Sequence, residues 1–115
     1  MESEHILGGQ EVNRDGIEVF DDDGYPSEEF LNAIAEANYK EGFETILDRA
    51  LSAHIYPHYW EKEDRGDHWL YYVSTGGWSG NEDIIAALQR NTMFWMVCWQ
   101  QSKRGGHFQF RVRKA

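Results

Sequence analysis

The sequence predicts an α+β fold in which helices cover one face of a mostly antiparallel sheet of about four strands. Three observations lead to this fold class. Residues 27–55 carry apolar side chains at helical spacing on both sides of Gly42, which predicts an αα-hairpin. Two β-hairpins follow, because segments that favour strands flank each of two polar turns. A further helix is predicted between the hairpins, at 81–91. The 115 residues suit a single domain, 1–115.

The N-terminal segment 1–26 is predicted to be irregular and acidic. Glycine, aspartate and asparagine interrupt it repeatedly, and these residues favour turns. Residues 16–20 alternate apolar and polar side chains, as a short strand does. The run 21–24 predicts a charged turn. It resembles part of a calcium loop, but the full spacing and the closing glutamate of such a loop are missing.

The first helix of the αα-hairpin is predicted to begin at Ser27. Its hydroxyl can cap free backbone amides, and the carboxylates of Glu28 and Glu29 suit the positive end of the helix dipole. Gly42 ends this helix, and a second one follows at once. The apolar stripe of the second helix is the clearest periodic signal in the chain: Phe43, Ile46, Leu47, Ala50, Leu51 and His54. Pro57 ends the second helix.

The first β-hairpin opens an aromatic half of the chain. Twelve of the 17 aromatic residues lie within residues 56–110, and aromatic residues favour strands. Two such strands, 58–62 and 69–74, flank a polar turn at 64–67. This pattern predicts an antiparallel pair.

The second β-hairpin is predicted at the C-terminus. Residues 93–99 are apolar on both alternating faces, which predicts a central strand covered on both sides. A tight turn at 103–106 leads to a strand at 107–113, which alternates cleanly. Its inward side chains are Phe108, Phe110 and Val112. This alternation leaves open that the last strand is a sheet edge which pairs with a second copy.

Charge is distributed unevenly between the two halves of the chain. The formal net charge is −9. Residues 1–68 hold 18 acidic and 5 basic side chains, a net of −13, whereas residues 69–115 hold 2 and 6, a net of +4. An acidic chain gains no bulk attraction to nucleic acid or to anionic lipid. An acidic face speeds association with a basic surface on a partner protein, so a protein partner is the expectation.

The sequence also favours a cytoplasmic location. No apolar run approaches the roughly 20 residues that cross a bilayer. The first five residues are acidic and lack the basic region of a secretory signal. Cys98 is the only cysteine and lies in an apolar run, which predicts a buried, inert thiol in a reducing compartment.

The segment with the most local information runs from Gly76 to Glu82, where a strand meets a helix. Ser79 and Glu82 have the spacing of a capping box, and free amides at a helix start attract anions. Three readings stay open: a structural connection with Trp78 in the core, a polar ligand or partner contact that involves Asn81, and a phosphate site. No lysine follows the last glycine, which argues against phosphate.

The run Ser74–Glu82 (STGGWSGNE), Phe94-Trp95, Trp99 and the run Arg104–His107 (RGGH) together resemble a pattern in short uncharacterised proteins of phages, prophages and bacteria. The resemblance covers about residues 69–112. It implies a small cytoplasmic accessory protein, encoded by a phage. It brings no activity and no site residues.

Other groupings predict neither a metal site nor a cofactor. His54 and His58 are four residues apart, but Pro57 between them ends the helix that would align them. A serine paired with His68 or His107 could act in hydrolysis, yet no nucleophile-elbow spacing supports this. Enzyme activity is therefore disfavoured.

The favoured hypothesis is a small acidic protein that binds and inhibits a host protein, such as a nucleic-acid-handling defence system. It would dock through the Trp78 loop or through an acidic surface made of Asp21, Asp22, Asp23, Glu28 and Glu29. One alternative is a small-ligand binder or enzyme that uses the Gly76–Glu82 turn, with Trp78, His68 and His107 lining the site. Another is a nucleic-acid binder that uses the basic C-terminal hairpin, although nucleic acid is disfavoured by the net charge. Oligomeric state stays open.

Overall fold

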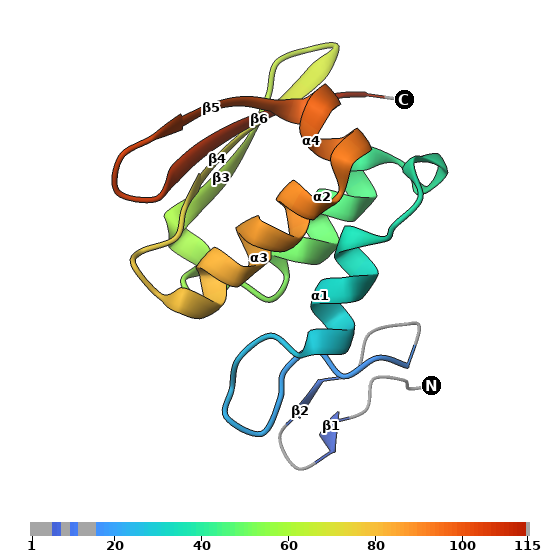
Figure 1. The fold of residues 1–115 in the computed structure, drawn as a ribbon. Helices are drawn as coiled ribbons and strands as arrows, with labels where there is room; N and C mark the ends of the chain where they lie inside the picture. The colour runs from blue at the N-terminus through green and yellow to red at the C-terminus, as the bar shows by residue number, and fades with distance from the viewer. Residues whose placement is uncertain (1–5, 8–9, 12–15, 115) are drawn as a thin grey trace.

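The computed structural model describes residues 6–7, 10–11 and 16–114. Within these ranges the chain forms four α-helices, a four-stranded sheet and a separate pair of two-residue strands (Figure 1). The helices are α1 (Glu28–Ala35), α2 (Phe43–Leu51), α3 (Ser79–Arg90) and α4 (Thr92–Cys98). The strands of the main sheet are β3 (Trp60–Asp64), β4 (His68–Ser74), β5 (Trp99–Lys103) and β6 (His107–Arg113). The short pair is β1 (Ile6–Leu7) and β2 (Gln10–Glu11), and 3-10 turns span Tyr39–Glu41 and Pro57–Tyr59.

The main sheet has the strand order β3-β4-β6-β5, and every neighbouring pair is antiparallel. Each hairpin pairs within itself, and the long central strands β4 and β6 join the two hairpins. Helices α3 and α4 lie in the connection between them. The last strand is therefore central, which answers the question that its alternation left open; the edge strands are β3 and β5.

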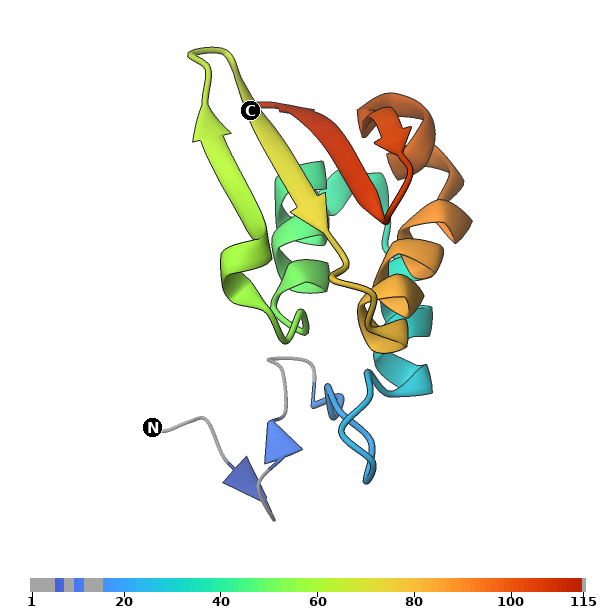
Figure 2. The same ribbon diagram turned by 90° about the vertical axis from the view of Figure 1, so that its left-hand side faces the viewer.

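The helices cover one face of this sheet, as the α+β prediction requires (Figures 1 and 2). Strand alternation decides which side chains reach them. Tyr71, Phe110 and Val112 point toward the helices and are buried in the core with α1, α2 and α3. Their neighbours along each strand, such as Tyr72 and Gln109, point to the opposite face of the sheet, which no described element covers.

The αα-hairpin is confirmed, with a shorter first helix. Ser27 caps α1, because its Oγ accepts a hydrogen bond from the Phe30 amide at 3.0 Å. Helix α1 ends at Ala35 rather than before Gly42. A separate 3-10 turn fills the gap, and the Asn38 side chain caps it by accepting from the Lys40 amide at 2.8 Å.

The predicted central strand at 93–99 is wrong, because residues 92–98 form helix α4. An apolar run without a clear period does not distinguish a buried strand from a helix. Phe94 and Cys98 are buried four residues apart, as on one face of a helix, while Met96 and Val97 lie exposed on the other. The strand forms only after this helix, over β5.

Asn91 produces the break between α3 and α4. Its Oδ1 accepts from the Phe94 amide at 3.2 Å and so caps α4. Its Nδ2 donates to the carbonyls of Ile34 at 3.0 Å and Ala37 at 3.1 Å. Ile34 lies in the last turn of α1, and Ala37 follows the helix. One buried side chain therefore joins the ends of three helices.

Two smaller expectations also fail. Residues 16–20 form no regular strand; Glu18 and Phe20 take part only in isolated bridges, that of Phe20 being with Pro26. Helix α3 begins at Ser79, with Trp78 at the capping position and no side-chain cap bond, so the capping box of Ser79 and Glu82 does not form.

Candidate binding groove on the open face of the sheet

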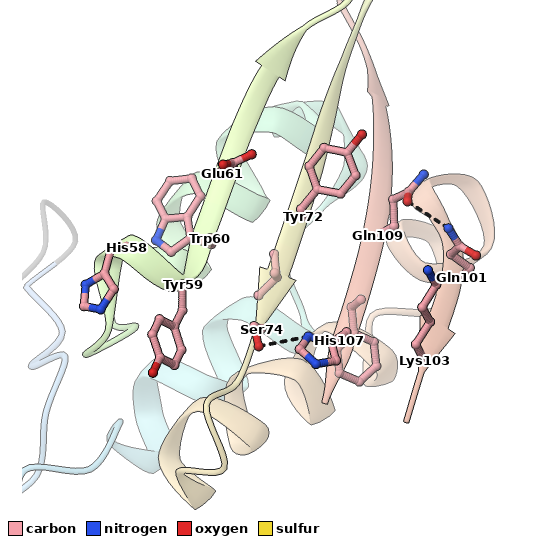
Figure 3. A pocket seen from close by; sticks show the side chains of 12 residues that line it. His58, Tyr59, Trp60, Glu61, Tyr72, Ser74, Gln101, Lys103, His107 and Gln109 are labelled. Carbon is pink, nitrogen blue, oxygen red and sulfur yellow. Dashed lines mark hydrogen bonds between the residues drawn. The ribbon is translucent and has the colours of Figure 1, made fainter. Parts of the chain in front are cut away.

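A groove of about 790 Å³ lies on the uncovered face of the sheet and is lined by residues from all four strands (Figure 3). Strand register places its outward side chains in two rows. The first row is Glu61, Tyr72, Gln109 and Gln101, which pair from β3 through β4 and β6 to β5. The second row, at the end of the sheet, is Tyr59, Ser74, His107 and Lys103.

The second row gathers hydroxyl, imidazole and ammonium groups. Ser74 Oγ and His107 Nδ1 are hydrogen-bonded at 3.0 Å across the β4–β6 pair. Lys103 pairs in register with His107 on the other side, and its side chain makes no hydrogen bond or ion pair with any described residue. An unpaired ammonium beside an imidazole and a hydroxyl is suited to a carboxylate or another anion.

The first row is held in place by its own hydrogen bonds. The Gln101 side-chain Nε2 donates to Gln109 Oε1 at 2.8 Å, and Gln109 Nε2 donates to Gln100 Oε1 at 2.9 Å. Gln100 lies at an irregularity in β5. Tyr72 keeps its ring over the centre of the groove. Glu61 adds a carboxylate at the β3 end.

Two glycine turns adjoin the second row, because Gly76 follows β4 and Gly106 directly precedes His107 of β6. Gly76 has a φ of +67°, and a Cβ there would lie 2.7 Å from the ring of Tyr59. Gly106 has a φ of +79°, and a Cβ there would collide with the Thr75 hydroxyl. The Thr75 amide donates to the Gly106 carbonyl at 2.9 Å, so the two glycine runs of the sequence pack against each other.

The residues predicted around the Gly76–Glu82 turn have mostly structural positions. Trp78 packs over Gly80 and lies 5.1 Å from the ring centre of Tyr25. Asn81 is 1% exposed, donates to the Thr75 carbonyl at 2.9 Å and accepts from the Ile55 amide at 3.3 Å. Ser79 is exposed at the start of α3.

Glu82 and His107 are the two predicted residues of this region that line hollows. Glu82 lines a small hollow of about 220 Å³ beside Thr75 and Gly106. His107 lines the large groove, whereas Trp78 lines neither. The structure therefore separates Trp78 and Glu82 from His107, which the small-ligand hypothesis had placed in one site.

The acidic residues form a second surface, away from the groove. Asp21, Asp22, Asp23, Glu28 and Glu29 are all exposed and lie in the turn before α1 and in its first turn. Asp21 shapes this turn, since its Oδ1 accepts from the amides of Asp23 at 2.9 Å and Tyr25 at 3.0 Å. None of the five lines the groove.

His54 has a structural position rather than a metal-binding one. It is 7% exposed, its Nδ1 accepts from the Tyr56 amide at 3.0 Å, and its Nε2 therefore donates to the Ser74 carbonyl at 2.9 Å. Burial lowers the pKa of this imidazole, so the ring is neutral at pH 7. His58 instead lines the groove. Among the described residues no three His, Cys, Asp or Glu side chains gather as metal ligands.

The described residues do not complete a hydrolase triad around Ser74 and His107. In the described part of the chain no carboxylate is hydrogen-bonded to His107, so the pair with Ser74 lacks the third member of a hydrolase triad. His68, the other candidate base, lies at the far end of β4, where its Nδ1 is 2.7 Å from Asp67. Cys98 is buried, and burial raises the pKa of its thiol to about 12, so it is not a nucleophile at neutral pH.

Comparison with known proteins gives no match: no family model, no curated protein and no solved structure is significantly similar to this chain. Within the described residues no helix is both long enough and apolar enough to cross a membrane.

The sequence reasoning missed most of the groove. Tyr59 and Tyr72 were not singled out, and Lys103 and Gln109 were named only as part of the basic C-terminal hairpin. For Gln109 a signal was present, because it alternates with inward Phe108 and Phe110. Lys103 was predicted to lie in a turn. It lies beside His107 only because residues 99–103 form strand β5, which was not predicted.

Proposed function

We propose that this protein is a binding domain that holds an extended segment of a partner protein in the groove on the open face of its sheet. The observation that carries the proposal is the order of chemical groups across the four strands. The Lys103 ammonium and the His107 imidazole lie on β5 and β6, the Ser74 hydroxyl and the Tyr72 ring on β4 at the centre, and the Glu61 carboxylate on β3.

This order predicts which kinds of side chain the bound segment carries and where each of them lies in the groove. An acidic side chain belongs over Lys103 and His107, where the ammonium has no described partner. An apolar or aromatic side chain belongs over the Tyr72 ring. Four strands about 4.8 Å apart span roughly 14 Å, which is the length of about four extended residues.

Selection from a random peptide library displayed on phage, with the purified full chain as bait, tests the proposal. We expect enriched peptides to carry Asp or Glu, and their dissociation constants can then be measured by calorimetry. Lys103→Glu should weaken them at least tenfold, about 1.4 kcal/mol. Lys40→Glu makes the same change of charge in the 3-10 turn outside the groove and should leave affinity nearly unchanged. No enriched peptide, or equal loss in both variants, would overturn the proposal.

The acidic surface supports a second candidate function. Five exposed carboxylates on one turn and one helix start can occupy a basic nucleic-acid channel, so the protein would act as a phage-encoded inhibitor of a host nucleic-acid-handling system. Quantitative pull-down from bacterial lysate distinguishes the two. A stoichiometric partner lost on reversal of the five acids, but kept by Lys103→Glu, would assign docking to the acidic surface. The opposite pattern would assign it to the groove.

A further inference from the structure

The small hollow of about 220 Å³, here called the α3 hollow, lies where α3 meets one end of the sheet. Three of its lining residues are spaced as on one face of α3: Glu82, Ile85 and Gln89. The facing wall comes from the sheet and its turns: Thr75 after β4, Gly106 before β6, and Phe108 of β6. Small-molecule pockets measure roughly 300–1,000 Å³, so the α3 hollow suits a single side chain.

The Glu82 carboxylate is the only ionisable group among the six residues that line the α3 hollow. The capping box that the sequence predicts would use this carboxylate, but no side-chain cap bond forms at the start of α3. Glu82 is exposed, and its side chain makes no hydrogen bond or ion pair with any described residue. Arg104 lies two positions before Gly106, yet it does not pair with Glu82. The α3 hollow therefore presents an unpaired negative charge.

The walls around this carboxylate suit the remaining parts of an arginine side chain. Phe108 is half-buried and packs toward the helices, and guanidinium groups stack on aromatic rings. Ile85 is 4% exposed and gives an apolar surface for the methylene stem. The Gln89 side chain has no partner among the described residues, so its oxygen is free to accept another N–H. A guanidinium also pairs with a carboxylate through two parallel N–H groups, which an ammonium does not offer.

We propose that the α3 hollow is an anchor site for an arginine side chain of a partner protein. The guanidinium pairs with Glu82 and contacts Phe108, while the stem lies against Ile85. A chain of net charge −9 attracts basic surfaces, and such surfaces carry arginine. Phe108 is the one residue that also lines the groove on the open face, so the α3 hollow is a separate site and does not depend on peptide binding in the groove.

NMR titration of the ¹⁵N-labelled full chain with the peptide acetyl-Gly-Arg-Gly-amide, at low ionic strength, tests this site. We expect the amides of residues 82–89 and 106–108 to shift. The matched peptide carries citrulline, which has nearly the shape of arginine without its charge, and should bind at least about fivefold more weakly. Glu82→Gln should remove this preference. Asp83→Asn makes the same change of charge at the next residue, which does not line the α3 hollow, and should keep the preference.

Three results would overturn the arginine site. The first is the absence of shifts at the α3 hollow, or equal affinity for the two peptides. The second is an equal loss of affinity in Glu82→Gln and Asp83→Asn. The third is a set of shifts centred on the carboxylates at 21–29, which would show attraction to negative charge in general. The amide spectra also show whether each variant is folded. The groove is tested with Lys103→Glu, so either proposal can fail without the other.

Discussion

Replacing Asn91 with alanine should be among the most destabilising polar substitutions in this protein. The side chain is buried and makes three hydrogen bonds to backbone groups, two at the end of α1 and one at the start of α4. Alanine removes all three, so the Ala37 carbonyl loses this partner and the Ile34 carbonyl keeps only weaker bonds such as that from the Ala37 amide at 3.3 Å. Helix α4, which has only seven residues, also loses its cap.

The cost follows from the three bonds. Loss of a helix cap costs about 1 kcal/mol. Loss of each of the two hydrogen bonds to the carbonyls costs about 1 kcal/mol. We therefore expect the free energy of unfolding to fall by about 3 kcal/mol, a large part of the roughly 5–15 kcal/mol that holds a domain of this size together.

Urea unfolding followed by tryptophan fluorescence measures this difference. Asn32→Ala is the matched control, because Asn32 is exposed and its side chain makes one long contact, 3.3 Å, with Arg90. That variant should change stability by less than about 0.5 kcal/mol. If Asn91→Ala cost no more than Asn32→Ala, the joint role of Asn91 in α1 and α4 would be refuted.

Three further predictions follow from buried groups and from the glycine turns. Burial lowers the pKa of His54 below its ordinary value of 6.5, so the unfolded chain binds more protons below that pH; stability should fall from pH 7 to pH 5, and the fall should be smaller in His54→Gln. Tyr71→Phe should cost about 1.5–3 kcal/mol, because the buried hydroxyl donates to a carboxylate of α2 at 2.6 Å, whereas Tyr72→Phe, whose hydroxyl contacts are 3.4 Å and longer, should cost little in the same urea assay. Gly76→Ala combines a positive φ with a ring contact and should lower the melting temperature more than Gly77→Ala, where φ is also positive but nothing lies within 4 Å; equal losses would show that backbone strain alone matters.

Local signals determined the parts of the fold that depend on neighbouring residues. Ser27 caps α1 as predicted, because the hydroxyl and the amide that it accepts from are three residues apart. The apolar stripe of α2 has the period of a helix, and it forms one over Phe43–Leu51. The alternation of β6 places Phe110 and Val112 in the core, as expected.

Tertiary contacts decided the parts for which the local signal was ambiguous. The run Met93–Trp99 is apolar at every position, so its sequence has no period; the buried cap of Asn91 and the single covered face of the sheet make it a helix. Strand β5 is polar and exposed, and only its pairing with β6 makes it a strand. The groove joins Glu61, Tyr72 and Lys103 from three strands, and no local pattern relates residues that strand pairing alone brings together.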